Sequence, residues 1–383
     1  MQPTGTVDPI ARPHSGRHRA VQGLRAACVL AILGFHVLNA GLLPAPQGEL
    51  AADAFWLSHG LRYGVEVFFM ISGYVIVGSL RRHASVGAFL QDRALRIFPL
   101  WIPLALAMLA AGSIGALHGG KIPAALSSGA TLLPSLAIMA PILPIPSIHP
   151  AQWSLNYELW FYGLAALAWT LGAARAWRIA AWALPAALMV TLFPRGLFFA
   201  PGVIVAISEP WLRQHARWLR YAWVGLPLAW VAWLDTDVEA AALTRTLVDL
   251  ASEGNGPAVI LAFAGATAFF AWLVIVQRDA SRGLLVHPAM QWLGTISYSF
   301  YLVHPLVLAA VKHGLLPHLP IDGWLAALVL AGAGLPLSCL FSWATWSLLE
   351  VRLRRWLVVQ LARRRSRRAA RPVTAPRPGE RRS

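Results

Sequence analysis

Charge is the scarcest component of this sequence. Only 13% of its 383 residues are Asp, Glu, Lys or Arg, whereas a soluble domain carries roughly 25%. Because 57% of the residues are hydrophobic, the few polar groups cannot cover the surface of a water-soluble fold. The same hydrophobicity excludes a disordered chain, since disorder requires low hydrophobicity. The composition therefore predicts a membrane protein.

Cysteine and lysine are also scarce. The two cysteines, Cys28 and Cys339, lie in apolar runs, where they are expected to pack as small hydrophobic side chains. Lysine occurs only twice, so 30 of the 32 cations are arginine, and the net charge is +16. No repeat with a period of 20–50 residues is apparent, which argues against a solenoid. Tryptophan and proline are abundant instead, as expected for a polytopic membrane protein with interfacial anchors and interrupted helices.

Long apolar runs dominate the chain. A membrane-spanning helix needs about 20 apolar residues, and the runs that approach this length lie at residues 26–43, 61–80, 97–117, 155–172, 177–194, 197–211, 218–234, 256–276, 292–311 and 324–349. These runs and their loops leave no room for a large soluble domain. The expected fold class is therefore all-α, a polytopic membrane bundle of about ten transmembrane helices.

A further apolar stretch, residues 121–150, is rich in proline. Its prolines would interrupt the backbone hydrogen bonds of a lipid-exposed helix. We therefore interpret this stretch as an extramembrane or re-entrant segment that packs on the bundle. The alternative is an eleventh span around residues 124–143, which would place the two termini on opposite sides of the membrane.

The distribution of arginine predicts the orientation of the bundle. With both termini in the cytoplasm, the outward segments keep only five cations: Arg62, Lys121, Arg195, Arg245 and Lys312. The others lie on the cytoplasmic side, as the positive-inside rule requires. We expect a multi-pass protein of the inner (plasma) membrane, with a basic cytoplasmic segment at residues 1–20 and a membrane domain at residues 21–351. The first apolar run lacks a small-residue cleavage site, so it is interpreted as a span and not as a signal peptide.

The C-terminal tail, residues 352–383, is rich in arginine, alanine and proline. Blocks of like charge repel one another and favour disorder. We therefore expect a disordered tail that contacts anionic membrane lipids of the inner leaflet. A nucleic-acid partner is not expected, because a basic tail beside a last span usually serves as a topology anchor. The sequence does not indicate an oligomeric state.

Two ionisable residues belong to the first span, Arg25 at its cytoplasmic start and His36 near its middle, where such groups are costly and are therefore candidates for function. Arg25 and His36 are 11 positions apart, which is three helical turns, so they share nearly the same helix face at a separation of about 16 Å. A histidine can take a proton from a hydroxyl and return it to a leaving group. The alternative is a packing histidine bonded to a neighbouring helix.

Three further positions belong to or follow the second span. Ser72 and the adjacent Gly73 let another helix or a ligand approach the backbone closely, and helix packing is the simpler interpretation. Arg93 and Arg96 share one face of a helix at the cytoplasmic boundary. They form either a membrane anchor or a clamp for a phosphorylated ligand, because a guanidinium group binds phosphate through two hydrogen bonds.

Polar residues also mark the fourth and ninth spans. Trp153 and Glu158 stand near the start of the fourth span, where an aromatic belt explains the tryptophan but not the carboxylate. Tyr301 lies one turn from His304 in the ninth span, and His304 is expected to be roughly as deep as His36. Together these residues predict a polar path that runs from the inner arginines through the two histidines to Glu158 on the outer side.

These motifs, in this order, resemble the signatures of the acyltransferase-3 family of integral-membrane acyltransferases. The match rests on the spacing of Arg25 and His36, on Phe-Phe-Met-Ile-Ser-Gly-Tyr at residues 68–74, on Arg-Ala-Leu-Arg-Ile-Phe-Pro at residues 93–99, and on two longer motifs at residues 153–162 and 297–304. It covers nearly the whole chain outside the tails. Members of the family commonly have a ten-span core, in agreement with the hydropathy of this sequence.

The resemblance implies an O-acyltransferase with acyl-CoA as its donor substrate, no permanently bound cofactor and no metal. The expected reaction moves an acyl group, acetyl above all, to a hydroxyl of a saccharide-containing cell-surface acceptor such as a glycan or glycolipid. Whether the catalytic histidine is a base or is itself acylated stays open. The site residues that the resemblance implies are the catalytic His36 with its partners Arg25 and Glu158, the coenzyme-binding Arg93 and Arg96, and the substrate-path residues Ser72, Trp153, Tyr301 and His304.

The sequence departs from the family pattern at two places, and it leaves a rival function open. Tyr74 stands where phenylalanine is frequent, and the residues after Glu350 lack a frequent proline. The rival is a proton-coupled secondary transporter or flippase, in which the same intramembrane histidines and carboxylates would relay protons. Transporters usually contain a repeat between their two halves, and none is apparent here.

Overall fold

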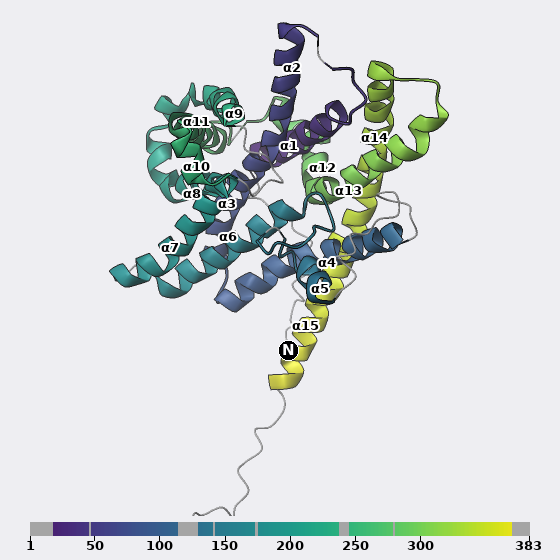
Figure 1. Ribbon diagram of the computed structural model, residues 1–383. Coiled ribbons are helices and arrows are strands. Elements are labelled where there is room, and N and C mark those ends of the chain that lie inside the picture. Colours follow the sequence, from purple (N-terminus) through teal and green to yellow (C-terminus); the bar gives the residue numbers. More distant parts are fainter. Residues whose placement is uncertain are drawn as a thin grey trace, which may run out of the picture.

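The computed structural model describes residues 18–45, 47–113, 129–140, 142–172, 175–236, 245–278 and 280–369. Within these ranges the chain consists of helices and connecting loops and contains no strand, so the predicted all-α class is confirmed there (Figure 1). The α-helices are α1 (Arg19–Leu38), α2 (Glu49–His59), α3 (Gly64–Arg82), α4 (Val86–Ser113), α5 (Gly129–Leu136), α6 (Gln152–Leu171), α7 (Ala176–Leu192), α8 (Phe199–Gln214), α9 (Gly225–Asp235), α10 (Leu247–Ser252), α11 (Gly256–Ile275), α12 (Pro288–Thr295), α13 (Ser297–Ala310), α14 (Gly323–Thr345) and α15 (Arg354–Ala369).

Short helical turns of other kinds connect several of these helices. The 3-10 helices are Gly60–Tyr63, Pro194–Phe198, Ala216–Leu219, Ala222–Val224, Leu284–Val286 and Leu316–His318. Two π-helical stretches, Val311–Leu315 and Trp346–Leu353, continue α13 and α14.

Among the described residues, six helical segments are long and apolar enough to cross a membrane. They are Arg19–Leu38, Glu49–Arg82, Val86–Ala110, Gly256–Ile275, Ser297–His318 and Gly323–Arg364. Two shorter apolar helices, Ala176–Leu192 and Ala222–Asp235, accompany them. The chain is therefore a multi-pass membrane protein. Six of the ten predicted runs coincide with the long segments, and the other four fall on α6, α7, α8 and α9.

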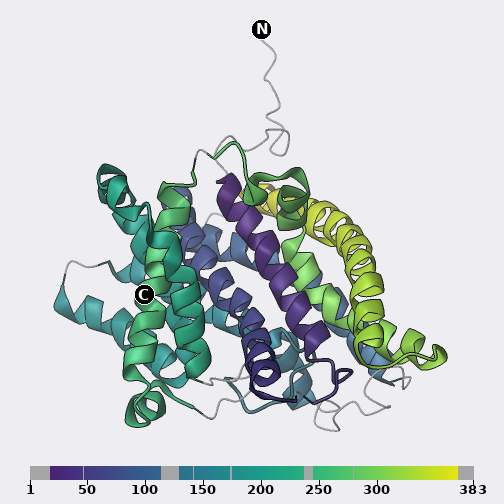
Figure 2. The same ribbon diagram turned by 90° about the horizontal axis from the view of Figure 1, so that it is seen from above.

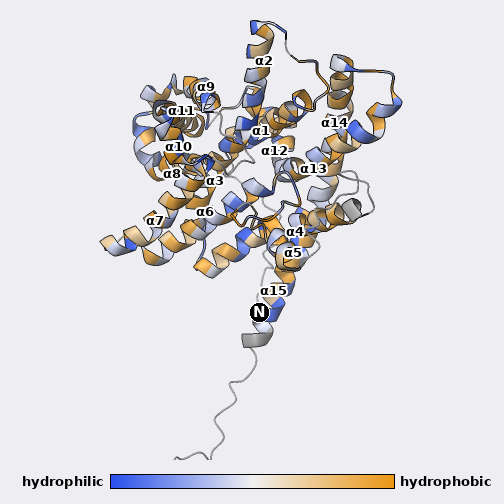
Figure 3. Ribbon diagram, in the orientation of Figure 1, coloured by the Kyte–Doolittle hydropathy of each residue, from blue (hydrophilic) through white to orange (hydrophobic). Residues whose placement is uncertain are grey.

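The long helices run beside one another and expose apolar side chains. Figure 2 shows α1, α3, α11 and α14 extending in the same general direction, and much of the helical ribbon in Figure 3 has the colour of hydrophobic residues. Leu184 on α7, Ile260 on α11 and Leu328 on α14 are 69%, 70% and 65% exposed. Outward-facing apolar side chains of this kind are expected where lipid replaces water around a helical bundle.

Helices α3 and α8 approach each other through glycine. A Cβ at Gly73 would lie 2.1 Å from the carbonyl oxygen of Phe199, and a Cβ at Gly202 would lie 1.9 Å from the carbonyl oxygen of Met70. No side chain fits at such distances, so only glycine permits this backbone contact. Gly73 therefore serves helix packing, while the adjacent Ser72 faces a cavity inside the bundle.

Three buried apolar clusters form the core, and Tyr301 packs against all of them. The first cluster is built mainly from α1, α3, α9 and α11, with α8 beside them. The second is built from α1, α12, α13 and α14, and the third mainly from α4 and α6. Because Tyr301 lies at their junction, polar groups near it are surrounded by several helices and are shielded from lipid.

The described part of the proline-rich segment packs on the bundle without spanning it. Helix α5 has 8 residues, which is too short to cross a membrane, and residues 114–128 and 141 lie outside the described ranges. The side chain of Gln152 accepts from the backbone N–H of Ile148 at 2.8 Å and donates to the carbonyl oxygen of Ser135 at 2.9 Å. These contacts favour the re-entrant or extramembrane interpretation over an eleventh span.

The predicted disorder of residues 352–383 is wrong for the first part of that tail. The π-helical stretch Trp346–Leu353 leads into α15, which extends to Ala369. Arginine, leucine and alanine favour helix formation, and an ion pair between Arg354 and Asp92 on α4, at 2.8 Å, ties the first turn of α15 to the bundle. Residues 370–383, like residues 1–17 at the other end, lie outside the described residues.

Candidate active site

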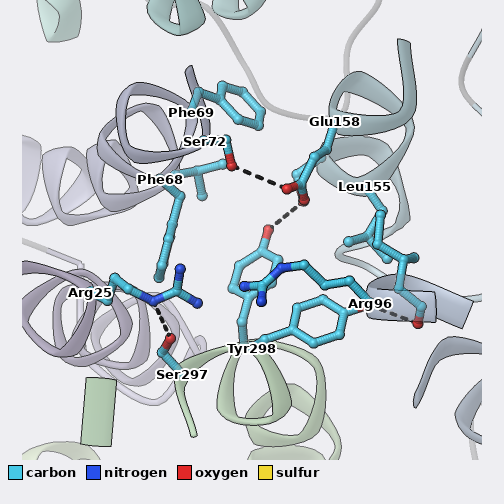
Figure 4. Close-up of a pocket in the computed structure, with 13 residues that line it drawn as sticks. Arg25, Phe68, Phe69, Ser72, Arg96, Leu155, Glu158, Ser297 and Tyr298 are labelled. Carbon is cyan, nitrogen blue, oxygen red and sulfur yellow. Dashed lines mark hydrogen bonds between the residues drawn. The ribbon is translucent and has the colours of Figure 1, made fainter. Parts of the chain in front are cut away.

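Five helices, α1, α3, α4, α6 and α13, enclose a small cavity that contains charged side chains (Figure 4). Its volume is about 60 Å³, whereas a single water needs about 10–15 Å³ on this scale. The cavity therefore holds a few waters, and a larger ligand requires movement of the surrounding helices. We call it the charged pocket, and its lining residues are Arg25, Val65, Phe68, Phe69, Ser72, Arg96, Ile97, Ser154, Leu155, Glu158, Ser297, Tyr298 and Tyr301.

Arg25 enters the charged pocket from α1. Its Nε donates to the hydroxyl of Ser297 at 3.0 Å, and its guanidinium group lies 5.7 Å from the centre of the Phe68 ring. This position depends on close packing of α1, because a Cβ at Gly23 would lie 1.8 Å from the carbonyl oxygen of Leu285. Glycine at this point lets α1 approach the segment before α12, which brings Arg25 within reach of the first residue of α13.

The two arginines of α4 lie in different surroundings. Arg96 lines the pocket, with its guanidinium group 5.9 Å from the centre of the Tyr298 ring. Arg93, one turn earlier, forms an ion pair with Asp92 and lies 5.8 Å from the centre of the Tyr162 ring. It does not line the pocket. Of the two predicted coenzyme-binding residues, the structure thus brings only Arg96 together with Arg25.

Glu158 places a carboxylate in the pocket from α6. The hydroxyl of Ser72 donates to its Oε1 at 3.1 Å, and the hydroxyl of Tyr162 donates to the same oxygen. Glu158 also interacts electrostatically with Arg25 and Arg96. The predicted position of Glu158 at the outer end of the path, beyond the histidines, is therefore wrong. The residue is about 9 Å along α6 from its first residue, and it lines the same pocket as Arg25 and Arg96.

Glu350 supplies a second carboxylate near the same arginines. It accepts a hydrogen bond of 2.5 Å from the hydroxyl of Ser299 and interacts electrostatically with Arg25 and Arg96. The residues after Glu350 depart from the family pattern, yet its side chain still reaches the pocket region. Two guanidinium groups thus face two carboxylates, which lowers the cost of removing all four charges from water.

His36 and His304 form a second polar site on α1 and α13. Their ring centres are 5.3 Å apart, in agreement with the expectation that they lie at a similar depth. His304 is fully buried, and its Nδ1 lies 2.8 Å from the carbonyl oxygen of Phe300. Its Nε2 has no hydrogen-bond partner within the described part of the chain. We call these two residues the histidine pair, and neither of them lines the charged pocket.

A third histidine, His149, lies close to the histidine pair, and the sequence analysis missed it. Its Nε2 is 2.8 Å from the carbonyl oxygen of Leu302, and its Nδ1 accepts from the backbone N–H of Ala151 at 2.9 Å. Burial lowers the pKa of His149 to about 4, so the ring is neutral at pH 7. The available signal was a histidine within an apolar, proline-rich stretch, where an ionisable side chain is costly.

Tyr301 lies between the charged pocket and the histidine pair. Its hydroxyl shares a hydrogen bond of 2.9 Å with the hydroxyl of Ser154. Its ring centre is 6.1 Å from that of Phe68 on the pocket side and 6.2 Å from that of His304 on the other side. A group that moves from the pocket to the histidines by the direct route therefore passes Tyr301.

Trp153 belongs to a separate polar cluster. The guanidinium group of Arg195 lies 4.3 Å from the centre of its ring and forms a buried ion pair with Glu66. The indole N–H of Trp233 also donates to Glu66, at 3.1 Å. The structure therefore does not bring Trp153 together with the other predicted path residues. The sequence analysis missed the link between Arg195 and Glu66 because the two residues are far apart in the chain.

The side chains that converge on the pocket and the histidine pair are guanidinium groups, carboxylates, hydroxyls and imidazoles. Guanidinium groups bind anions through charge-assisted hydrogen bonds, and a neutral imidazole accepts a proton from a hydroxyl. Among the residues that the structure describes, no group of three or more His, Cys, Asp or Glu side chains is arranged to hold a metal ion.

Comparison with known proteins connects this arrangement to a family. A family model described as an acyltransferase domain matches residues 18–343. The exopolysaccharide production protein ExoZ of Rhizobium meliloti (strain 1021) is 27% identical over 290 residues, which cover 70% of this chain and 84% of ExoZ. The acyltransferase MdmB of Streptomyces mycarofaciens is 26% identical over 321 residues, which cover 77% of this chain and 80% of MdmB. No solved structure matches the chain. The chain belongs to the acyltransferase-3 family and is a membrane O-acyltransferase.

Proposed function

We propose that this enzyme transfers an acyl group, with acetyl the expected one, from acyl-CoA to a hydroxyl of a saccharide-containing acceptor at the cell surface. The observation that carries the proposal is the succession of two sites, an arginine-containing pocket and, past Tyr301, a pair of histidines. The name of one relative, an exopolysaccharide production protein, supports a saccharide acceptor.

Acyl-CoA suits the charged pocket because guanidinium groups bind its phosphates. In this proposal Arg96 and Arg93, one turn apart on α4, contact the coenzyme. The Nε of Arg93 is buried and has no hydrogen-bond partner in the described part of the chain, so its N–H is free to donate to an anionic ligand. Arg25 and Glu158 then guide the thioester end toward the histidine pair. The cavity is too small for the coenzyme, so binding requires movement of the surrounding helices.

His36 is the proposed general base. It takes the proton of the acceptor hydroxyl as the hydroxyl oxygen attacks the carbonyl carbon of the thioester. A new C–O ester bond forms, the C–S bond breaks, and the thiolate of coenzyme A leaves and receives the proton back from His36. Arg25 and His36 are separated by about 16 Å along α1. The thioester, still joined to coenzyme A, therefore has to reach from the pocket past Tyr301 to His36 before the attack. Ser72 and His304 are assigned to this substrate path, and the earlier expectation that Trp153 also belongs to it stays a prediction.

The proposed topology has ten spans in the inner (plasma) membrane, with both termini in the cytoplasm. Helices α6, α7, α8 and α9 would add four spans to the six long segments. Arg93 and Arg96 then face the cytoplasmic supply of acyl-CoA, and the acceptor binds on the opposite side. A C-terminal tag tests this topology, because we expect it to resist protease added to intact cells. Cleavage of the tag in intact cells would contradict the topology.

The enzymatic proposal is tested by His36→Ala in cells that lack their own copy of the gene. Because general-base catalysis contributes about 10²- to 10⁴-fold, we expect the variant to lose the O-acyl groups of surface glycans, measured by mass spectrometry. Release of coenzyme A from acetyl-CoA by the purified variant is expected to fall by the same factor. The matched control is His313→Ala, which changes an exposed histidine and should retain activity. Full O-acylation by His36→Ala at wild-type expression would refute the mechanism.

A further inference from the structure

We infer that His304 is a positioning residue for His36. Its Nε2 accepts a hydrogen bond from one ring N–H of His36, which leaves the other ring nitrogen of His36 free to take the proton of the acceptor hydroxyl. The inference deepens the proposed function, because it rests on His36 being the base. It assigns the orienting partner of that base to a residue of α13.

The protonation pattern of His304 follows from its hydrogen bond. Its Nδ1 lies 2.8 Å from the carbonyl oxygen of Phe300, and a carbonyl oxygen only accepts hydrogen bonds. Nδ1 therefore carries the proton, and Nε2 of the neutral ring carries a lone pair. The ring also stacks on that of Phe300, at 5.5 Å and an interplanar angle of 15°, which holds it in this orientation.

The lone pair on Nε2 is unused in the structure. The atom is fully buried and has no hydrogen-bond partner among the residues described. Most buried polar atoms in proteins are hydrogen-bonded, so an orphaned acceptor calls for an explanation. A hydrogen-bond donor that binds Nε2 during the reaction would explain the missing partner. The ring N–H of His36 is the candidate, because the two rings are in contact.

The separation of the two rings matches such a contact. Imidazole nitrogens lie about 1.2 Å from their ring centre, so a hydrogen bond of about 2.9 Å between two of them places the centres about 5.3 Å apart. The observed distance between the ring centres of His36 and His304 is 5.3 Å, with the planes tilted by 50°. The inferred hydrogen bond therefore needs the His36 ring to turn so that one of its N–H groups points at Nε2 of His304.

The other candidates for this role are already engaged. Both nitrogens of His149 are hydrogen-bonded to backbone groups, so its ring has no free acceptor. Arg25 and Glu158, the partners expected from the sequence, lie in the charged pocket, which His36 does not line. Arg25 also lies three helical turns from His36 on α1, about 16 Å away. His304 is therefore the residue placed to orient His36.

The kinetic test compares two substitutions of His304 in the purified full-length protein. His304→Phe keeps a flat ring on Phe300 but removes the acceptor, whereas His304→Gln keeps an oxygen that can accept the same hydrogen bond. The probe is acetyl-CoA with water as the acceptor, followed by release of coenzyme A. We expect His304→Phe to lower kcat by about 10-fold or more and to change KM for acetyl-CoA by less than about twofold. His304→Gln should retain most of kcat.

A second measurement does not depend on acyl transfer. Diethyl pyrocarbonate acylates unprotonated imidazole, and a histidine whose N–H donates to an acceptor has a more basic opposite nitrogen. We expect the modification rate of His36, followed by peptide mass spectrometry, to fall several-fold in His304→Phe and to be retained in His304→Gln. The exposed His313 serves as the internal reference in each sample.

Three results would overturn the inference. The first is an unchanged kcat and His36 modification rate in His304→Phe, and the second is a raised KM with unchanged kcat. The third is His304→Gln being as impaired as His304→Phe, which would indicate a packing role. Should His304→Phe fail to accumulate in the membrane, His304→Leu replaces it in the same comparison. If His36→Ala keeps its activity, the proposed base is wrong, and the modification rate still decides whether the histidines interact.

Discussion

The charged pocket and the histidine pair keep their polar groups inside the bundle in different ways. In the pocket, Arg25 donates to Ser297, Glu158 accepts from Ser72, and each charge faces an opposite one. In the histidine pair, His304 keeps a buried nitrogen that has no partner within the described ranges. A ligand of the pocket must therefore displace contacts that already exist, whereas a donor that reaches the histidine pair finds an acceptor that is free.

This difference predicts different kinetic consequences for the two regions. Some groups bind acyl-CoA equally well in the ground state and in the transition state. Removing such a group raises KM and leaves kcat unchanged. Removing a group that acts only during proton transfer lowers kcat. Substitutions in the pocket should therefore change mainly KM for acyl-CoA, and substitutions in the histidine pair should change mainly kcat.

A buried ion pair lies outside both regions, so its loss should change the stability of the protein without changing its kinetics. Of the effects predicted here, this one should be the largest. Arg195 and Glu66 have side chains that are 3% and 0% exposed. Arg195→Met leaves a buried carboxylate without its countercharge, which destabilises by about 3–5 kcal/mol. We expect a lower Tm in detergent, with kcat per folded molecule unchanged. The double variant Glu66→Gln, Arg195→Met should recover part of the lost stability. A changed KM for acetyl-CoA would instead indicate that this ion pair contributes to acyl-CoA binding in the charged pocket.

The next effect is a pH dependence of stability to which the buried His149 contributes. Burial lowers the pKa of His149 to about 4, whereas a hydrated histidine titrates near 6.5. Between these values the unfolded state takes up a proton that the native state does not. Stability therefore falls as the pH falls from about 6.5 to about 4, by up to about 3 kcal/mol. The measurement is Tm at pH 7.5 and pH 4.5, and His149→Gln should reduce the difference between the two values. An equal pH dependence in the variant would show that another group is responsible.

The smallest of these effects concerns the two arginines of α4. Arg96 lines the pocket, whereas Arg93 is paired with Asp92. A hydrogen bond to a charged group contributes about 1.5–3 kcal/mol, or roughly 10- to 100-fold in affinity. We expect Arg96→Ala to raise KM for acetyl-CoA by about this factor with little change in kcat, and Arg93→Ala to have a smaller effect. A larger effect of Arg93→Ala would place the coenzyme outside the charged pocket.

Helical periodicity and the cost of ionisable groups in a membrane were enough to predict part of the site. They singled out Arg25, His36 and His304 before any contact was known, because each lies in an apolar run where a charged or titratable group is rare. For His36 and His304, which lie on different helices, the sequence predicted a similar depth in the membrane but not that the two rings are in contact. The 5.3 Å between their ring centres depends on how α1 and α13 pack.

Other parts of the site depended on contacts between distant segments. Glu158 was expected at the outer end of the path, but the packing of α6 against α3 gives it Ser72 as a partner. His149 was overlooked because its segment has no periodic pattern that shows which side faces the bundle. The first part of the tail was expected to be disordered, and the contact between Arg354 and Asp92 cannot be recognised without knowing that α15 lies beside α4.

The sequence by itself determined that this protein is a helical membrane acyltransferase. Its hydropathy and arginine distribution predict a helical membrane protein, and its ordered motifs indicate the family. These patterns can be recognised along the chain without knowledge of the fold. Tertiary structure alone decided which polar residues share a site. Helix faces come together through packing, most closely at positions such as Gly23 and Gly73, where a side chain would keep the backbones apart. That packing divides the polar residues between a charged pocket and a histidine pair, with Tyr301 between them.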